Sequence, residues 1–161
     1  MNIRPYNAED ATAMAILFQR SVRGVGRLHY SARQVDAWAA RGPDAARIRA
    51  QCADGRIIRI AENDAGEIIG FCDLEPIGHI DFLYCAPESN RLGVGAALYQ
   101  AIEMAARNWN LTRLHVEASE AARLFFWNMG FSLTQRRDFE IAGVPIHNFA
   151  MAKVLTPLRV G

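Results

Sequence analysis

The chain has 161 residues, of which 51% are hydrophobic and 22% charged, and its formal net charge is +1. A chain of this length buries enough apolar surface for one core, so we expect a single domain over residues 1–161 with no disordered tail. A net charge near zero supplies no overall field that attracts nucleic acid or an anionic membrane. Any anion must therefore be bound by a local site.

The cysteines and the N-terminal segment indicate the cellular compartment in which the protein is expected. Cys52, Cys72 and Cys85 lie far apart and form no CxxC pair, which argues against a disulfide framework and a structural zinc site. The first ten residues are charged, and no apolar run approaches the ~18 residues that suggest a membrane span. We expect a cytoplasmic protein that has no metal and binds neither membrane nor nucleic acid.

The N-terminal third is predicted to be mostly helical. A capping asparagine at Asn7, followed by apolar residues at helical spacing, predicts a helix over residues 8–20. The glycine-rich stretch 23–27 is expected to break the chain. An S-x-x-Q capping box opens a second helix over residues 31–38, and a short helical stretch follows at 44–51.

The middle of the chain has strand patterns instead. Residues 57–61 and 67–74 are predicted strands joined by turn residues at 63–66, and a further strand is expected over residues 79–85. These three strands are expected to pair antiparallel.

The C-terminal half returns to helical spacing. An amphipathic helix is predicted from Gly93 to about Asn108, followed by a strand at 113–117 and a helix at 119–129. Two final strands flank a turn at 142–143 and end near Lys153. The whole pattern predicts an α/β (α+β) fold.

The segment from Cys85 to Ala96 contains a strand, a short loop and two glycines that open a helix. Glycines let main-chain N–H groups approach a ligand closely, and a helix N-terminus adds free donors and a partial positive charge. Such a cradle suits a diphosphate, although a tight turn that serves only packing is the alternative. A P-loop is excluded because no G-K-[ST] occurs, and the antiparallel hairpins before it do not fit a dinucleotide-binding βαβ unit.

Two segments carry a resemblance to a known family. Residues 90–95, Asn-Arg-Leu-Gly-Val-Gly, resemble the acetyl-CoA signature Q/R-x-x-G-x-G/A of the GNAT acetyltransferase superfamily. Residues 119–131 are similar to its second segment, N-x-x-A-x-x-L-Y-E-K-x-G-F. The resemblance implies a mixed, mostly antiparallel sheet flanked by helices. It also implies transfer of an acetyl group from acetyl-CoA to a primary amine of a small molecule, amino acid or peptide.

The resemblance implies a cofactor site as well. Loop amides at 91–96 would hold the pyrophosphate, and the main chain around Leu83 and Cys85 would pair with the pantetheine arm, with the thioester where the fourth strand splays from the fifth. The cofactor-binding residues expected on this basis are Leu83, Tyr84, Cys85, Asn90, Arg91, Leu92, Gly93, Val94, Gly95, Ala96, Ser119 and Phe126.

The expected catalytic groups lie on the strand before the loop. The N–H near Leu83 would donate to the oxyanion. His79 aligns with a position where some members carry a carboxylate base, and an imidazole with a pKa near ~6.5 can accept the proton of an amine. Asp81 lies two residues on and would orient His79 or contact a cationic substrate. A solvated edge histidine and a surface salt bridge are the alternatives for His79 and Asp81.

Phe126 departs from the family pattern, because many members have a proton-donating tyrosine there. Tyr84 or water would serve as the acid, or none is needed because a thiolate with a pKa near ~8.5 leaves readily. The departure keeps a second hypothesis open, a catalytically weak acyl-CoA sensor or interaction module. Cys85 is interpreted as a small hydrophobe rather than a covalent nucleophile.

The acceptor site is expected at residues 23–30 and 142–147, by resemblance to the fold. Arg23, Arg27 and His29 suggest a polar, anionic acceptor, although loop arginines are often only solvated. Strand edges in such folds pair between subunits, so a homodimer is expected.

Overall fold

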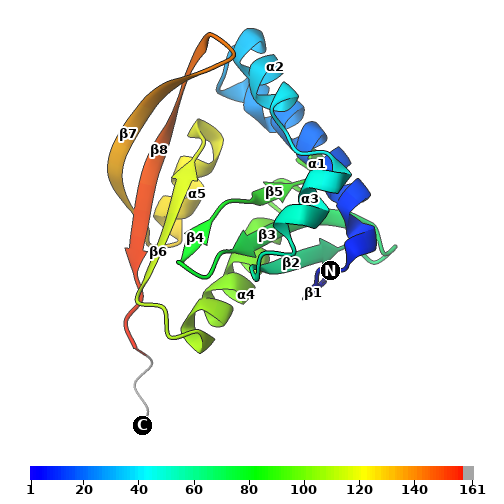
Figure 1. The fold of residues 1–161 in the computed structure, drawn as a ribbon, viewed down its shortest axis with the longest axis vertical. Coiled ribbons are helices and arrows are strands. Elements are labelled where there is room, and N and C mark those ends of the chain that lie inside the picture. The colour runs from blue at the N-terminus through cyan, green and yellow to red at the C-terminus, as the bar shows by residue number, and fades with distance from the viewer. Residues whose placement is uncertain (158–161) are drawn as a thin grey trace.

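The computed structural model describes residues 1–157 and contains two four-stranded sheets flanked by helices (Figure 1). The α-helices are α1 (Ala11–Val25), α2 (Ala32–Ala40), α3 (Ala45–Gln51), α4 (Val94–Asn108) and α5 (Glu120–Asn128). The strands are β1 (Asn2–Pro5), β2 (Ile57–Glu62), β3 (Ile68–Leu74), β4 (His79–Ile80), β5 (Leu83–Cys85), β6 (Arg113–Ala118), β7 (Ser132–Ile141) and β8 (Val144–Val154). Short 3-10 helices are η1 (Ala8–Asp10), η2 (Gly26–Leu28) and η3 (Pro87–Ser89).

The first sheet has the strand order β1-β2-β3-β5 and is antiparallel throughout. Side chains alternate between its faces. Ile60 and Phe71 pack with the helices α1–α3, whereas Cys72 and Leu74 pack with α4 on the other face. The sheet is therefore enclosed between two helical layers.

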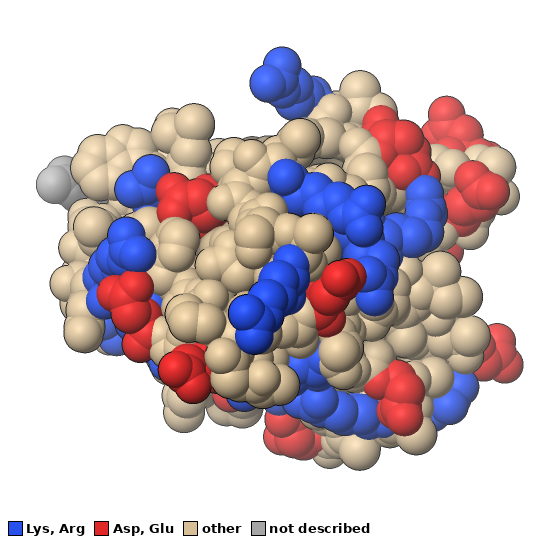
Figure 2. Space-filling model, turned by 90° about the horizontal axis from the view of Figure 1, so that it is seen from above, with Lys and Arg blue, Asp and Glu red and all other residues tan. Residues whose placement is uncertain are grey.

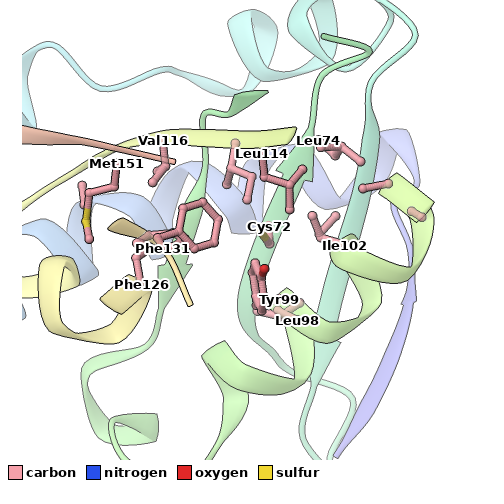
Figure 3. Close-up of a cluster of buried hydrophobic side chains, with 14 of the residues drawn as sticks. Cys72, Leu74, Leu98, Tyr99, Ile102, Leu114, Val116, Phe126, Phe131 and Met151 are labelled. Atoms are coloured by element: carbon pink, nitrogen blue, oxygen red, sulfur yellow. The ribbon is translucent and has the colours of Figure 1, made fainter. Parts of the chain in front are cut away.

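The second sheet has the order β4-β6-β8-β7, in which β4 runs parallel to β6 and the other pairs are antiparallel. Phe126 of α5 and Phe131 contact the same buried cluster as Leu98 of α4 (Figure 3). That shared cluster joins both sheets and fixes how α4 and α5 sit beside them.

The strand predicted at 79–85 is wrong as a single element. It divides into β4, which joins the second sheet, and β5, which joins the first. The expected set of three antiparallel strands is therefore β2, β3 and β5 alone. The division opens the sheet at residues 81–82.

The predicted break at 23–27 is also wrong, because α1 continues to Val25 and η2 follows it. Gly24 lies where a Cβ would come within 2.7 Å of Pro87 Cγ, and Gly26 faces the ring of Trp38. These glycines allow close packing of the helix, and that packing outweighs their low helix propensity.

Most other predicted elements are confirmed, including the N-cap at Asn7 and the capping box at Ser31. The strand β1 was not predicted, because four residues with Pro5 at the end carry too little periodicity. The mixed, mostly antiparallel fold is the predicted one. Within residues 1–157, no helix is long and apolar enough to cross a bilayer.

Candidate active site

A buried carboxylate binds the main chain at the opening between the two sheets, where β4 ends and β5 begins. Asp73 is fully buried, and its Oδ1 accepts the main-chain N–H groups of Asp81 at 2.9 Å and Phe82 at 2.7 Å. Its Oδ2 lies 2.6 Å from a guanidinium nitrogen of Arg56. Burial raises the pKa of Asp73 to about 7, while the Phe82 N–H and Arg56 act in the opposite direction. Asp73 thereby fixes the position of the opening.

The free edge of β5 presents main-chain groups to that opening. The Asp73 N–H donates to the Phe82 carbonyl, and the Ala86 N–H donates to the Ile69 carbonyl. Since main-chain groups alternate in direction along an antiparallel strand, the N–H and C=O groups of Leu83 and Cys85 point away from β3. An extended ligand can therefore pair with this edge as an added strand.

The loop before α4 supplies a second set of donors. Arg91 and Gly93 both have left-handed backbones, with φ of 67° and 78°. The N–H groups of Arg91, Gly93, Val94, Gly95 and Ala96 have no hydrogen-bond acceptor among residues 1–157. Converging free N–H groups at a helix N-terminus form an anion-binding site.

The two glycines of the loop have different roles. A Cβ added at Gly93 would meet nothing within 4 Å, so this residue borders open space. A Cβ at Gly95 would come within 3.3 Å of the Phe125 ring and 3.8 Å of Cys85 Sγ. Gly93 leaves room in front of the donors, whereas Gly95 allows α4 to pack against α5 and β5.

The remaining expected cofactor residues surround these two sets of donors. Asn90 and Leu92 are exposed on the loop. Ser119 Oγ accepts the Ala122 N–H and so caps α5. Phe126 is buried, with its ring 5.1 Å from that of Phe131. Its aromatic ring offers no acidic proton.

A cleft of about 480 Å³ adjoins the opening. Its inner end includes Asp81 and Leu83, and its walls come from α2, α3 and the β7–β8 hairpin. In Figure 1 the turn of the β7–β8 hairpin meets α2 at the top, and below that contact the hairpin lies on the left and α3 on the right. A small acceptor in the cleft would face the edge of β5.

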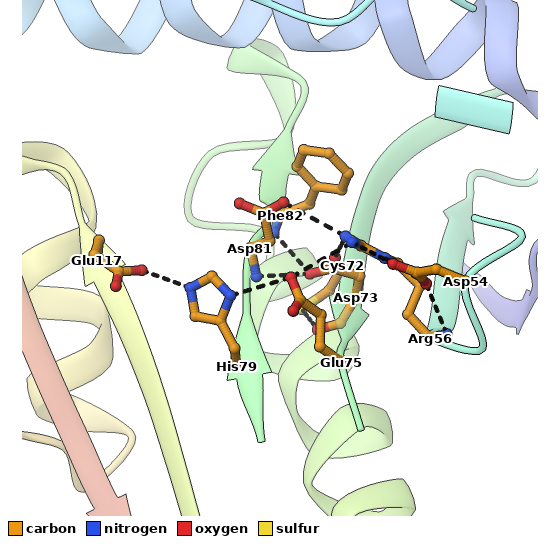
Figure 4. Close-up of polar contacts among 9 residues, drawn as sticks. All are labelled: Asp54, Arg56, Cys72, Asp73, Glu75, His79, Asp81, Phe82 and Glu117. Atoms are coloured by element: carbon orange, nitrogen blue, oxygen red, sulfur yellow. Dashed lines mark hydrogen bonds and ion pairs between the residues drawn. The ribbon is translucent and has the colours of Figure 1, made fainter. Parts of the chain in front are cut away.

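The environment of His79 does not favour the expected role as a base. Nδ1 lies 3.2 Å from a carboxylate oxygen of Glu75, and Nε2 lies 2.5 Å from one of Glu117 (Figure 4). The hydrogen bond with Glu117 is the main cause that raises the pKa of His79 to about 9. At neutral pH the ring is an imidazolium, which has no lone pair to accept a proton.

Asp81 does not orient His79, contrary to one of its expected roles. Its Oδ2 approaches a guanidinium nitrogen of Arg56 at 3.4 Å instead, and 37% of its side chain is exposed at the cleft. The split of the predicted strand causes this difference, because the two residues no longer share one regular strand face. The expected contact of Asp81 with a cationic substrate fits its place on the cleft.

Tyr84 and Cys85 remain protonated at neutral pH. The Tyr84 ring packs 4.7 Å from Phe18 and 5.7 Å from Phe71, and burial raises the pKa of its hydroxyl well above the usual value. The hydroxyl is therefore protonated at neutral pH, and burial makes it a weaker acid than an exposed tyrosine. Burial also raises the pKa of the Cys85 thiol to about 11, which makes it a poor nucleophile at neutral pH.

The expected acceptor segments are only partly at the cleft. Tyr30 and His147 line it, and the Tyr30 hydroxyl donates to the His147 carbonyl at 2.8 Å. Arg23 does not line the cleft and pairs instead with Asp36 at 2.8 Å. Arg41 and Arg47, which were not predicted as site residues, do line it.

Comparisons with known proteins agree with this geometry. A family model described as an acetyltransferase (GNAT) domain matches residues 27–153. The uncharacterized N-acetyltransferase YafP of Escherichia coli strain K12 is 30% identical over 152 residues, which cover 94% of each chain.

Solved structures extend the likeness. A GCN5-related N-acetyltransferase from Rhodopseudomonas palustris has a TM-score of 0.86 and 34% identity over 96% of this chain and 95% of its own. The acetyltransferase yncA of Salmonella typhimurium, solved with acetyl-CoA, has a TM-score of 0.74 and 18% identity over 100% and 97%. The second likeness shows the shared fold. By its sequence match and its fold, the chain belongs to the GNAT acetyltransferase family and is an acyltransferase.

Proposed function

We propose that the protein transfers the acetyl group of acetyl-CoA directly to a primary amine of a small molecule, amino acid or peptide. One observation carries the proposal: the free edge of β5 leads into a loop whose N–H groups, from Arg91 to Ala96, are free at the start of α4. The main-chain groups on the edge of β5 suit the amide-containing pantetheine arm, and the N–H groups of the loop suit a diphosphate. The Salmonella relative named above was solved with acetyl-CoA.

The residues present fit acetyl-CoA. In the proposed complex, Leu83 and Cys85 pair with the pantetheine arm, and the open space at Gly93 receives the pyrophosphate. Asn90 and Leu92 lie on the loop beside that space. Ser119 caps the start of α5, and the buried ring of Phe126 anchors α5 in the core. Acetyl-CoA supplies a thioester, which is an acyl group activated toward amines.

The chain itself contributes a hydrogen-bond donor to the acyl oxygen and an acceptor for the proton of the amine. The Leu83 N–H lies at the opening, where it would stabilise negative charge on the acyl oxygen. Asp81 is the carboxylate at the cleft that we propose takes the proton of the amine, directly or through water. His79 instead carries a positive charge that neutralises Glu117. Tyr84 keeps its proton and is the side chain that we propose as donor to the leaving thiolate, with water as the alternative.

Phe126 favours a second candidate, a weakly catalytic acyl-CoA sensor. The buried phenylalanine occupies the position of the family's tyrosine, so that position contributes no acid. The sensor predicts tight acetyl-CoA binding and no turnover with any amine. The enzyme predicts release of CoA that depends on an added amine.

The first experiment is a calorimetric titration with acetyl-CoA of the wild type, Gly93→Glu and Gly66→Glu. Both glycines have positive φ, 78° and 79°, and neither has an atom within 4 Å of an added Cβ. The two variants therefore carry equal charge and similar backbone strain, and only Gly93 lies at the proposed cradle. We expect Gly93→Glu to weaken binding at least ~100-fold and Gly66→Glu to bind as the wild type does. A wild type that binds no acyl-CoA, or equal effects of both variants, contradicts the proposal.

A further inference from the structure

A cluster rich in carboxylates adjoins the inner end of the cleft, and two of its members, Asp81 and Glu117, line the cleft itself. Around the cations Arg56 and His79 lie the carboxylates of Asp54, Asp73, Glu75, Asp81 and Glu117 (Figure 4). The carboxylates outnumber the cations, so the field at this end favours a positively charged group. An amine acceptor that arrives protonated satisfies that preference.

The wall formed by the connection between α2 and α3 has the opposite charge. Arg41 and Arg47 both line the cleft, and neither guanidinium group has a carboxylate within 4.0 Å in the part of the chain that the structure describes. A guanidinium nitrogen of Arg47 donates to the Arg41 carbonyl at 3.2 Å, which holds the two residues together. The other donors of both guanidinium groups are available to a ligand.

Arg137 on the opposite wall is in a different situation. It lies near enough to Glu117 to lower the pKa of that carboxyl, after the larger effect of His79. Its guanidinium carbon is also 5.8 Å from the Phe139 ring. The charge of Arg137 thus acts on groups of the protein, whereas Arg41 and Arg47 have no such partner.

Two buried acceptor atoms in the same cleft point to a ligand that donates hydrogen bonds. Gln51 and Asn148 line the cleft, and their buried side-chain oxygens, Oε1 and Oδ1, have no hydrogen-bond partner among residues 1–157. Buried polar atoms without partners are uncommon in native proteins. An N–H or O–H group of a bound acceptor would satisfy them.

We propose that the acceptor carries an anionic group, a carboxylate or a phosphate, in addition to its amine, and that Arg41 and Arg47 bind this group. The inference rests on the proposed function and narrows it, because the cleft then selects a zwitterionic amine over a neutral or purely cationic one. Seen from above, the molecule has basic side chains in several groups, some beside acidic ones (Figure 2). Recognition therefore depends on this local pair of arginines rather than on a broad basic surface.

The test uses pairs of acceptors that differ only in the anionic group. Amino acids are compared with their amides, β-alanine with β-alanine amide, and phosphoethanolamine with ethanolamine. We expect kcat/KM to be at least ~10-fold higher for the anionic member, and the pairs separate carboxylate from phosphate recognition. Arg41→Gln and Arg47→Gln should each reduce that preference about 10-fold by raising KM for the anionic member, and leave its neutral partner unchanged.

Arg49→Gln is the matched control. It lies on α3 with Arg47, removes the same charge, and contacts the Ala8 carbonyl outside the cleft. The same compounds are also titrated into the protein with and without CoA, so that charge preference is measured even without turnover. A preference lost in Arg47→Gln but kept in Arg49→Gln supports the inference. Neutral members that bind and react as well as anionic ones overturn it, whereas loss of acetyl-CoA binding in the wild type overturns the proposed function.

Discussion

The two sides of the candidate active site use different kinds of groups, main-chain groups on the cofactor side and side chains on the acceptor side. On the cofactor side, the main chain provides the groups, as free N–H donors of β5 and of the loop before α4. On the acceptor side, side chains from α2, α3, β6 and β8 provide them. Main-chain donors depend on backbone geometry and tolerate many side chains, whereas side-chain recognition changes with each substitution. The donor substrate can therefore be inferred from a short segment of sequence, whereas the acceptor can be inferred only from the assembled cleft.

The largest expected effect concerns the group on which both sides depend. Asp73→Ala removes the acceptor for the Asp81 and Phe82 N–H groups and leaves Arg56 with its buried partner missing. We expect a loss of about 3–5 kcal/mol in the free energy of unfolding, because two N–H groups lose their acceptor and Arg56 loses the one fully buried carboxylate among its partners. Chemical denaturation measures it, and Asp64→Ala is the control.

Asp64 is a fair control because its side chain is 98% exposed and pairs only with the N-terminal amine. Its replacement should leave the free energy of unfolding nearly unchanged, because an exposed ion pair contributes little. Equal effects of the two variants would show that Asp73 does not hold the opening.

The next effect separates the main-chain side from the acceptor side. Leu83→Pro removes an N–H that points away from β3, and proline is tolerated at such an edge position. If this N–H stabilises the acyl oxygen, kcat should fall about 100- to 1000-fold while acetyl-CoA binding changes little. Steady-state kinetics measure kcat, and calorimetry measures the affinity for acetyl-CoA.

Cys85→Pro is the matched variant, because its N–H points to the same free edge. It should weaken acetyl-CoA binding more than it lowers kcat. The same kinetic pattern for both variants would contradict a special role of Leu83.

The smallest effect concerns His79 and depends on pH. The pKa of His79 is raised from 6.5 to about 9 in the folded chain, so the folded state binds the proton more tightly than the unfolded one. The resulting stability is fully present below pH 6.5 and is lost as pH rises through 9. His79→Gln should therefore lower the free energy of unfolding by about 2–3 kcal/mol at pH 6, and the difference should vanish near pH 10.

The pH–rate profile distinguishes this role from that of a base. In His79→Gln the acidic limb of kcat/KM should persist, whereas Asp81→Asn should lower kcat about 10- to 100-fold. Loss of the acidic limb in His79→Gln together with full activity of Asp81→Asn would restore His79 as the base.

The amino-acid sequence by itself determined the local features and the family. Capping boxes, hairpin turns and the Gly93-Val94-Gly95 loop depend on contacts within a few residues, so their patterns predict them directly. The donors of the loop follow from the same short segment. For that reason the expected cofactor, the order of most elements and the fold were all predictable.

The tertiary structure decided the rest, because it depends on residues that are distant in sequence. The ring of His79 meets Glu117, 38 positions away, and that contact turns an expected base into a cation. The predicted strand at 79–85 divides because Asp73 on β3 takes up the N–H groups between its halves. Arg41 and Arg47 face the cleft only once α2 packs beside the hairpin and α3 packs on α1. A side chain's pKa and partners are set by what surrounds it in space, and no local pattern carries that information.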